Sequence, residues 1–497
     1  MILWLDKKRK MRYNVKCEIM YFKGRNHMAK QMIMPPDDLS SRLEYAQKIK
    51  TWNQASPVKR KVYVQTFGCQ QNEADSEKYL GMALSMGYEA TDTPQNADLI
   101  IVNTCAIREH AEKKALSIIG QYKHIKVKNP RLIIGVCGCM VAQEHRREEL
   151  KMKYPYVTFT LGTASLHHLP RVLWEAIESQ KRLITMDSDV DFTETVAEGM
   201  PIRRGSDYRA WVSIMYGCNN FCSYCIVPYV RGRERSRKKE DIVAEVRALV
   251  HEGYKDITLL GQNVNSYGKG TDTDFADLLA ELDAIEGDFW LRFMTSHPKD
   301  ASHKLIDVMA NGKHIAHQFH LPLQSGNDRV LKAMNRHYDM AKYMDSVQYM
   351  REKMPDVTIT SDIIVGFPGE SEEEFEDTLN ALRNVKFDML YSFIYSSRKG
   401  TPAAEKEQVP DTVKGNRFDR LLTVQNEIAL SKNSPLQGKT LQVLCDGVSK
   451  GDDSVYSGRT EGNKIVFFKG TPDMVGHFVN VSINKTEAFA LWGEIEK

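Results

Sequence analysis

The sequence predicts an α/β protein with three domains: an open parallel sheet, an open partial α/β barrel and a small antiparallel β-barrel. In residues 61–181 and again in residues 204–434, short apolar strands alternate with amphipathic helices, which favours parallel sheets. Residues 435–497 instead contain short alternating strands separated by Gly, Asp and Asn turns, a pattern typical of a small barrel. A length of 497 residues agrees with about three domains.

Residues 1–60 precede the first predicted strand and form a basic extension, with 14 Lys and Arg against 5 Asp and Glu. Such a segment can bind phosphates, and the alternative is a solvated, disordered extension. The methionines at 28, 32 and 34 leave open a natural start further along the chain. The first ten residues lack the layout of a secretory signal, and no apolar run reaches the roughly 20 residues of a membrane span. We therefore expect a cytoplasmic protein that does not enter a membrane.

The first domain, residues 61–181, contains four strands rich in β-branched residues and four helices. The predicted strands are 62–66, 99–104, 132–136 and 157–161, and the predicted helices are 74–86, 107–122, 141–151 and 166–180. Their alternation predicts a parallel sheet covered on both faces. The polar residues 182–203 are predicted to be a linker.

Three of these strands end in cysteine, at Cys69, Cys105 and Cys139. Because ligands bind open parallel sheets at the carboxyl ends of the strands, the three thiols are predicted to meet at one edge as a three-thiolate site. Cys137 competes with Cys139 as the ligand, since alternate residues of an extended segment point the same way. The alternative is that all of them are buried thiols in an apolar setting.

The second domain, residues 204–434, has six predicted strands with helices between them, including helices at 239–252 and 372–384. The strands are 210–215, 257–260, 290–295, 317–321, 358–364 and 389–394. This order predicts an open partial (β/α)6 barrel, whose functional residues are expected at the mouth where the strands end.

The loop that follows the first barrel strand contains Cys218, Cys222 and Cys225 at the spacing C-x3-C-x2-C. Three thiolates from one loop can bind three corners of an iron–sulfur cube and leave the fourth iron open for a substrate or cofactor. A structural zinc site is the alternative, but it normally has four protein ligands, and the sequence offers no second C-x2-C pair. The nine cysteines are not spaced as a disulfide framework.

The tips of the other barrel strands place small and polar residues at the mouth. Gly261, Gln262, Gln324, Ser325 and Asp362 are candidates to bind an adenosine, ribose or amino-acid group. The alternative for each residue is an ordinary loop cap. Between the cysteine loop and the next helix, residues 231–239 contain six positive side chains, which form either a solvated face or a strip that contacts phosphates.

Several of these segments resemble known motifs. The loop MYGCNNFCSYCIV resembles the signature of radical S-adenosylmethionine enzymes, in which the open iron binds the methionine group of the cofactor. TFGCQQN, NTCAIRE and GCM resemble the three motifs of the methylthiotransferase N-terminal domain, although Gln71 stands where that family usually has Met. Residues 231–237 match the family's RG-x-E-x-SR motif, and residues 435–497 resemble the RNA-binding TRAM module.

The resemblance to the methylthiotransferases covers residues 62–497 and implies two 4Fe–4S clusters together with S-adenosylmethionine. The implied ligands are Cys69, Cys105 and Cys139 for an auxiliary cluster, and Cys218, Cys222 and Cys225 for the radical cluster. His297 and His320 are interpreted as structural, because hydrogen abstraction by a radical needs no general base.

The resemblance also implies a tRNA-modifying enzyme that adds a methylthio group to C2 of N6-isopentenyladenosine beside the anticodon. Its partners would be the anticodon stem-loop of tRNA, an electron donor and a sulfur source, and the chain would act as a monomer. The alternative substrates are threonylcarbamoyl-adenosine in tRNA and an aspartate of a ribosomal protein. A noncatalytic RNA-binding metal protein is the alternative from outside the family.

Any RNA binding by residues 435–497 would depend on a local face, because this segment has a net charge of −1. The candidates are Arg459, Lys464 and Lys469, with Phe467 or Phe468 available for stacking on bases. The alternative is a β-domain that only packs on the barrel.

Overall fold

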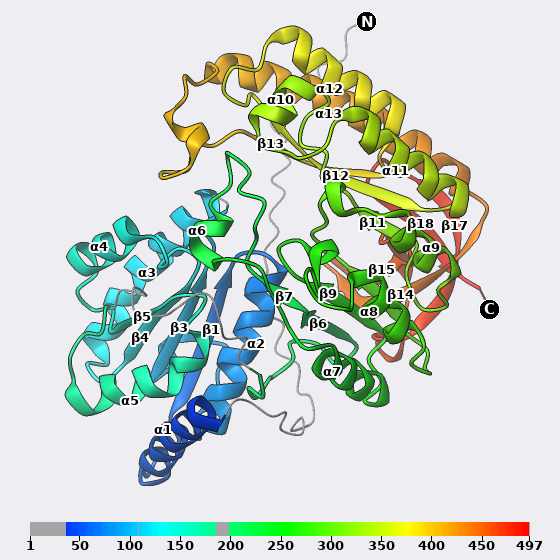
Figure 1. Ribbon diagram of the computed structural model, residues 1–497. Coiled ribbons are helices and arrows are strands. Elements are labelled where there is room, and N and C mark those ends of the chain that lie inside the picture. The colour runs from blue at the N-terminus through cyan, green and yellow to red at the C-terminus, as the bar shows by residue number, and fades with distance from the viewer. Residues whose placement is uncertain (1–35, 108, 185–197, 497) are drawn as a thin grey trace, which may run out of the picture.

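The structure is a computed structural model that describes residues 36–107, 109–184 and 198–496. It confirms the three predicted folds, which Figure 1 shows in blue to cyan, green to orange, and red. The start of the predicted basic extension, with Met28, Met32 and Met34, and most of the predicted linker lie outside the described residues. Within the described ranges, no helix is both long and apolar enough to cross a membrane.

The first domain is a five-stranded parallel sheet in the order β2-β1-β3-β4-β5. Its strands are β1 (Lys61–Phe67), β2 (Glu89–Ala90), β3 (Leu99–Thr104), β4 (Ile133–Gly138) and β5 (Phe159–Leu161). Its helices are α1 (Pro36–Gln54), α2 (Gln70–Ser85), α3 (Glu109–Lys128), α4 (Glu144–Lys153) and α5 (Leu169–Ser179), with short 3-10 turns at Pro94–Asn96 and Leu166–His168. Both faces are covered as predicted: Leu99 and Ile101 pack with α1, α2 and α5, whereas Ile100 and Val102 pack with α3 and α4.

Helix α1 lies inside the segment that the sequence assigned to the basic extension. Its Ile49 is fully buried against the sheet domain, and its Arg42 donates hydrogen bonds to the carbonyl oxygens of Glu198 and Gly199. A disordered extension is therefore wrong for residues 36–54. This helix is difficult to predict because its polar and apolar residues show only a weak periodicity.

The second domain is the predicted open partial barrel, with six parallel strands adjacent in chain order. The strands are β6 (Arg209–Ser213), β9 (Asp256–Leu260), β10 (Trp290–Phe293), β11 (Gln318–His320), β12 (Thr358–Val365) and β13 (Met389–Ile394). The two halves of the sheet join where the amide of Leu291 donates to the carbonyl of His314 at 2.7 Å and its carbonyl accepts from Ala316 at 2.9 Å.

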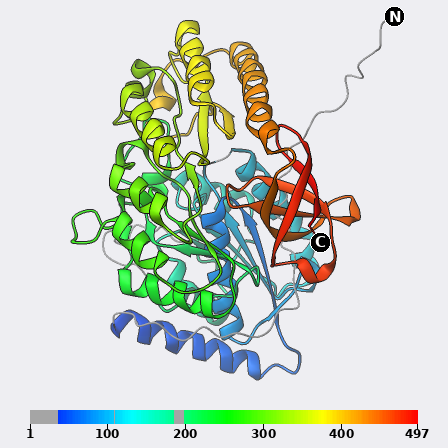
Figure 2. The ribbon, with the colours of Figure 1, turned by 90° about the vertical axis from the view of Figure 1, so that its right-hand side faces the viewer.

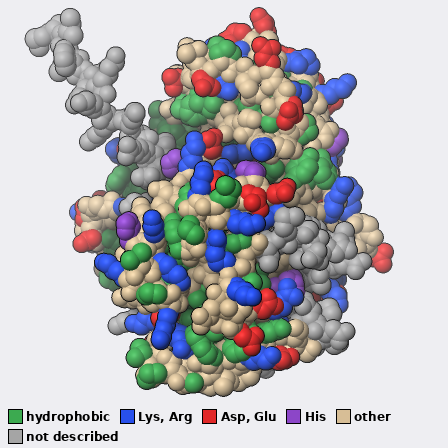
Figure 3. Space-filling view, turned by 90° about the vertical axis from the view of Figure 1, so that its left-hand side faces the viewer, with side chains coloured by type: hydrophobic (Ala, Val, Ile, Leu, Met, Phe, Trp, Pro, Cys, Tyr) green, Lys and Arg blue, Asp and Glu red, His purple; other side chains and the backbone are tan. Residues whose placement is uncertain are grey.

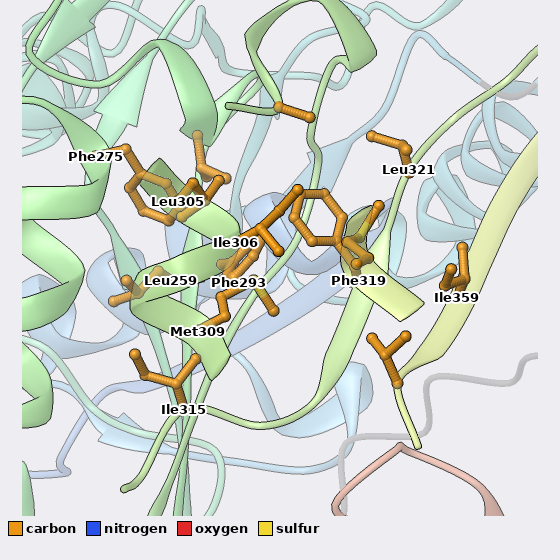
Figure 4. Close-up of a cluster of buried hydrophobic side chains, with 14 of the residues drawn as sticks. Leu259, Phe275, Phe293, Leu305, Ile306, Met309, Ile315, Phe319, Leu321 and Ile359 are labelled. Carbon is orange, nitrogen blue, oxygen red and sulfur yellow. The ribbon is translucent and has the colours of Figure 1, made fainter. Parts of the chain in front are cut away.

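Helices cover the outer face of this sheet. They are α7 (Lys239–His251), α8 (Phe275–Asp283), α9 (His303–Asn311), α10 (Asp328–Ala333), α11 (Met340–Lys353), α12 (Glu372–Val385) and the long α13 (Asp411–Asn433), with 3-10 turns at Val264–Ser266, Pro298–Asp300, Pro402–Glu405 and Ser434–Leu436. Figure 4 shows the core beneath them, where the rings of Phe275 and Phe319 both meet Phe293 edge to face at 5.2 Å. This packing fixes the strands whose ends form the mouth.

The C-terminal domain is a closed barrel in the order β14-β15-β16-β18-β17. Its strands are β14 (Thr440–Ser449), β15 (Asp452–Thr460), β16 (Ile465–Lys469), β17 (Phe478–Thr486) and β18 (Leu491–Ile495), with a 3-10 turn at Pro472–Met474. One pair of strands, β16 with β18, is parallel in an otherwise antiparallel barrel. Figure 2 shows this domain directly below α13.

The turn between β15 and β16 docks the C-terminal domain onto the end of the partial barrel opposite the mouth. Arg292 donates to the carbonyl oxygen of Thr460 at 3.1 Å and to that of Glu461. The Glu461 carboxylate accepts from the amide of His317 at 2.9 Å. Gly462 lies so close to Thr358 that an added Cβ would be 2.2 Å from the hydroxyl oxygen. The C-terminal domain is therefore held in one orientation on the barrel.

A buried chain of ion pairs fixes the first domain to the second. Arg204 pairs with Glu77 of α2 at 3.0 Å and with Glu245 of α7, and Arg237 pairs with Glu245 at 2.7 Å and with Glu198 at 2.6 Å. Burial alone would raise the pKa of Glu245, but the two guanidinium groups lower it to about 2. Each of these buried charged groups therefore has at least one partner of opposite charge in the interface.

Candidate active site: two cysteine sites at the domain interface

The C-x3-C-x2-C loop leaves the barrel after β6 and is closed at its base by a two-stranded ribbon, β7 (Met215–Tyr216) with β8 (Arg235–Ser236). It ends in the short helix α6 (Val227–Arg231). Cys218 and Cys222 are buried and Cys225 is half-buried. We call these three residues the loop site.

The backbone of the loop site is held from three directions. Gly217 has φ of +80°, and an added Cβ would lie 1.9 Å from the carbonyl oxygen of Arg233, so only glycine fits there. Its amide donates to Oε1 of Gln262 at 2.6 Å, and the amide of Cys218 donates to the carbonyl of Gly232 at 3.1 Å. From the far side, Nδ2 of Asn335 donates to the carbonyl oxygen of Phe221, which itself has φ of +46°.

The thiols of the loop site are close enough to affect one another electrostatically. Burial raises the pKa of Cys218 to about 12, and the neighbouring Cys222 adds to this shift. Burial and Cys222 raise the pKa of Cys225 as well. Nη1 of Arg336 donates to Sγ of Cys222 at 3.3 Å. Three thiolates at this place need further positive charge, which iron would supply.

In the described part of the chain, no three Cys, His, Asp or Glu side chains converge as they would around a single metal ion. The cysteines of an iron–sulfur cube bind separate irons and lie further apart than the ligands of one ion. The donor set of the loop site, three thiols with one arginine beside them, fits such a cube.

The second group of cysteines lies at the carboxyl ends of three neighbouring strands, as predicted. Cys69 follows β1, Cys105 follows β3 and Cys139 follows β4. Two buried asparagines shape this edge: Nδ2 of Asn72 donates to the carbonyl of Thr104 at 3.2 Å, and Nδ2 of Asn103 donates to the carbonyl of Asn72 at 2.8 Å. We call Cys69, Cys105 and Cys139 the edge site.

The structure separates Cys137 from Cys139, which the sequence left open. Cys137 still belongs to β4 and is fully buried in the core with Phe159 and Tyr79. Gly138 then adopts φ of +94°, which ends the alternation of the strand. As a result, Cys139 turns toward the second domain and packs with Ala106, Ile226 and Val230.

The two sites meet through α6. This helix begins two residues after Cys225, and its Val230 packs against Cys139 of the edge site. In Figure 1, α6 lies at the ends of the strands of the first domain, between that domain and the barrel. The loop that follows the first barrel strand thus contributes residues to both cysteine sites.

The five predicted rim residues do not all face the mouth in the same way. Gly261 packs on Met215, and Gln262 supports Gly217 of the loop. Ser325 is fully buried, with its hydroxyl 3.4 Å from that of Thr378 in α12. The amide of Gln324 donates to the carbonyl of Asp362 at 2.8 Å, and the carbonyl of Gln324 accepts from the amide of Ile364 at 3.0 Å.

The rim predicted from the sequence leaves out a set of polar atoms at the ends of β9 and β10, among them those of His297, which the sequence suggested to be structural. They are buried and lack a hydrogen-bond partner within the described structure: Oδ1 of Asn263, the amide group of Asn265, Oγ of Ser296 and Nε2 of His297. Burial and the charge of Arg336 lower the pKa of His297, so its ring is neutral. Because unpaired buried polar groups are costly, these atoms favour a polar ligand at this place. Asn263, Ser296 and His297 could have been found from the sequence, because they lie in the strand tips LLGQN (residues 259–263) and TSHP (residues 295–298).

The basic run in residues 231–239 is not simply a solvated face. Arg231, Arg237 and Lys239 each pair with a carboxylate. Arg233 and Lys238 are exposed, and Arg233 lies 4.3 Å above the ring of Phe221. Figure 3 shows a face of the molecule on which Lys and Arg are spread among acidic and apolar side chains. A contact with phosphates remains a prediction for the exposed part of the run.

The predicted RNA-binding face of the C-terminal domain needs correction. Phe468 is buried in the core of that barrel, and Lys464 pairs with Asp388 at 2.9 Å, so neither is available for RNA. Phe467 lies on the other side of β16, where its ring is 4.8 Å from that of Trp492. Alternation along a strand places only one of two neighbouring phenylalanines outside.

Three family models match consecutive parts of the chain. The uncharacterized protein family UPF0004 matches residues 61–162, the Radical SAM superfamily matches residues 212–382, and the TRAM domain matches residues 436–495. These matches coincide with the three structural domains.

Curated relatives match almost the whole chain. A tRNA-2-methylthio-N(6)-dimethylallyladenosine synthase of Thermoanaerobacter sp. (strain X514) is 49% identical over 436 residues, which are 87% of this chain and 92% of the relative. A protein of the same description from Acetivibrio thermocellus is 47% identical over 474 residues, or 94% and 98% of the two chains. Among solved structures, the radical S-adenosylmethionine methyltransferase TsrM from Kitasatospora setae has a TM-score of 0.51 at 12% identity and covers 70% of this chain and 77% of its own. That likeness shows the fold alone.

Proposed function

This chain belongs to the tRNA-2-methylthio-N(6)-dimethylallyladenosine synthases, which are radical S-adenosylmethionine methylthiotransferases, and from that membership we propose how its two cysteine sites divide the reaction. The radical domain implies one 4Fe–4S cluster and S-adenosylmethionine. We assign that cluster to the loop site and a second 4Fe–4S cluster to the edge site. The observation that carries the assignment is the contact between them, in which α6 joins Cys225 to Cys139.

When bound, the reduced cluster of the loop site and S-adenosylmethionine supply a carbon radical, and the cluster of the edge site supplies sulfur for C2 of the adenine. The chain's own residues hold these groups in place. Gln262 and Gly232 accept from the amides of Gly217 and Cys218, and Arg336 donates to Cys222. Burial of the thiols keeps water from the reacting groups.

The second ligand of the loop site is S-adenosylmethionine, whose amino, carboxylate, ribose and adenine groups need polar partners. We propose that Asn263, Ser296 and His297 provide them, together with the rim defined by Gly261, Gln262, Gln324, Ser325 and Asp362. The unpaired atoms of the first three support this role most directly. Ser325 and Gln324 contribute mainly through the position of the backbone, because the Ser325 hydroxyl faces Thr378.

The substrate is tRNA, in keeping with the family and with the TRAM domain. We propose that the anticodon stem-loop reaches the mouth, and that the outer face of the C-terminal barrel contacts the tRNA further from the modified adenosine. This contact uses the aromatic pair of Phe467 and Trp492, with Lys469 beside them on β16. We further propose that the chain needs an electron donor and a sulfur source as partners. It would act as a monomer in the cytoplasm.

Iron analysis tests the assignment of the two clusters. After anaerobic reconstitution, the chain is expected to bind about eight irons, and replacing the cysteines of either site by alanine should leave about four. Zinc at stoichiometry without iron would instead support a noncatalytic metal protein. Nucleoside mass spectrometry of tRNA from cells lacking the protein tests the activity: the methylthio form should disappear and should return with the wild-type chain but with neither variant. Its persistence would contradict the function.

A further inference from the structure

The segment that follows β13, residues 396–403, leaves the barrel and contacts the first domain, and we call it the bridging segment. Nη2 of Arg398 donates to the carbonyl oxygen of Ile107 at 2.8 Å. The hydroxyl of Ser396 donates to Oε2 of Glu109 in α3 at 2.9 Å. Both contacts lie just after the cysteine of the edge site that follows β3.

The other end of the bridging segment contacts the loop site. The amide of Ala403 donates to the carbonyl oxygen of Ser223 in the cysteine loop at 2.9 Å. Between the two ends, the amide and the hydroxyl of Thr401 donate to the carbonyl oxygen of Arg398 at 3.0 and 2.7 Å, and Thr401 is fully buried. The bridging segment is therefore a second fixed connection between the two sites, on the side of β13, whereas α6 joins them on the side of β6.

Ile107 connects Arg398 to a thiol of the edge site. Its amide donates to Sγ of Cys105 at 3.3 Å, while its carbonyl oxygen accepts from Arg398. The hydrogen bond from Arg398 thus fixes the backbone of the residue whose amide contacts the sulfur. The Arg398 side chain is mostly buried, and its Nη1 lies 4.0 Å from Glu112, which pairs with Arg146 at 3.0 Å.

We propose that Arg398 is a positioning residue for the edge site, and that it holds Cys105 in place as a cluster ligand by fixing the backbone of Ile107. This inference rests on the proposed function, because it requires a cluster at the edge site. Groups that donate to a ligating atom orient it toward the metal. A hydrogen bond from a guanidinium group is charge-assisted and stronger than a neutral one, so it opposes movement of the loop that contains Cys105.

The test uses the full-length chain with Cys218, Cys222 and Cys225 replaced by alanine, so that only the cluster of the edge site assembles. After anaerobic reconstitution, the rate of iron release to a chelator measures how often a ligand leaves the cluster. Arg398→Ala is expected to release iron about tenfold faster than this parent, which is the factor for losing one hydrogen bond made by a charged group. Arg398→Lys keeps a charged donor, and its rate is expected to lie between the two.

Arg146→Gln is the matched control. It removes the arginine that pairs with Glu112 next to Arg398, and it leaves the hydrogen bond from Arg398 to Ile107 in place. It should lower thermal stability and leave the rate of iron release unchanged. An equal acceleration in this control would show that loss of a neighbouring arginine suffices, and it would overturn the proposal.

A second comparison uses the chain in which the three cysteines of the edge site are replaced by alanine, so that only the cluster of the loop site assembles. Arg398→Ala should not change iron release in this chain, because the contact of Ala403 with Ser223 remains. Faster release there by the same factor would mean that the substitution loosens the whole interface, and it would overturn the proposal.

Unchanged release in Arg398→Ala, with about four irons per chain, overturns the inference and leaves the assignment of the clusters intact. Absence of iron in the parent overturns both. If circular dichroism shows that Arg398→Ala does not fold, Arg398→Gln takes its place, and unchanged release in that variant overturns the proposal.

Discussion

Gly138 decides whether Cys139 can reach the edge site, and Gly138→Ala tests this. The residue has φ of +94°, where a side chain costs about 1–3 kcal/mol. An added Cβ would also lie 2.4 Å from Oδ1 of Asn103 and 2.4 Å from the carbonyl oxygen of Thr104, and overpacking of this kind costs a further 1–3 kcal/mol, roughly. Together the two costs destabilise the native backbone by about 2–6 kcal/mol. A rotation of the backbone at Gly138 would relieve this cost, and it would turn Cys139 away from the edge site.

Gly138→Ala is therefore expected to lose most of the iron of the edge site and to keep about four irons at the loop site. Gly253→Ala is the matched control, because Gly253 has φ of +92° and no atom within 4 Å of the added Cβ. It should cost about 1–3 kcal/mol and keep about eight irons. Iron analysis and thermal unfolding of both variants measure the difference. A Gly138→Ala chain with full iron and the melting temperature of the control would refute the reasoning.

Three further predictions concern other parts of the molecule. Cys139→Ala should lose the iron of the edge site, whereas Cys137→Ala should keep it and lose about 1–2 kcal/mol of stability, and equal iron contents would contradict the assignment. The pKa of Glu245 is lowered from 4.5 to about 2, so its stabilisation is present above pH 4.5 and is lost as the pH falls toward 2. The free energy of unfolding, measured in urea across this pH range, should depend less on pH in Glu245→Gln than in the wild type. Parallel pH profiles of the two proteins would contradict the stabilising role of the ion pairs. Phe468→Ala should cost about 3–5 kcal/mol, while Phe467→Ala should mainly weaken tRNA binding, by about 1–3 kcal/mol in a binding titration. Unchanged affinity in Phe467→Ala would rule out the proposed stacking.

Which features could be predicted depends on whether they arise from residues close together in the chain or from contacts between distant segments. The positions of Cys69, Cys105 and Cys139 after successive strands were readable because a parallel sheet brings its strand ends to one edge. The loop site was readable because its three cysteines lie within eight residues. Helix α1 was missed because a weakly periodic segment takes its structure from the partners it packs on.

The sequence alone determined the three folds, the two cysteine sites and the family, since these depend on local periodicity, spacing and motifs. Only the tertiary structure decided which atoms meet. Gly138 turns Cys139 and not Cys137 toward the second domain, and Arg231 crosses the interface to pair with Asp75. Its ion pair joins residues 156 positions apart in the chain. Such contacts depend on how the domains are packed. They cannot be predicted from the sequence pattern, because the pattern of a segment does not show which side chains of another domain it will contact.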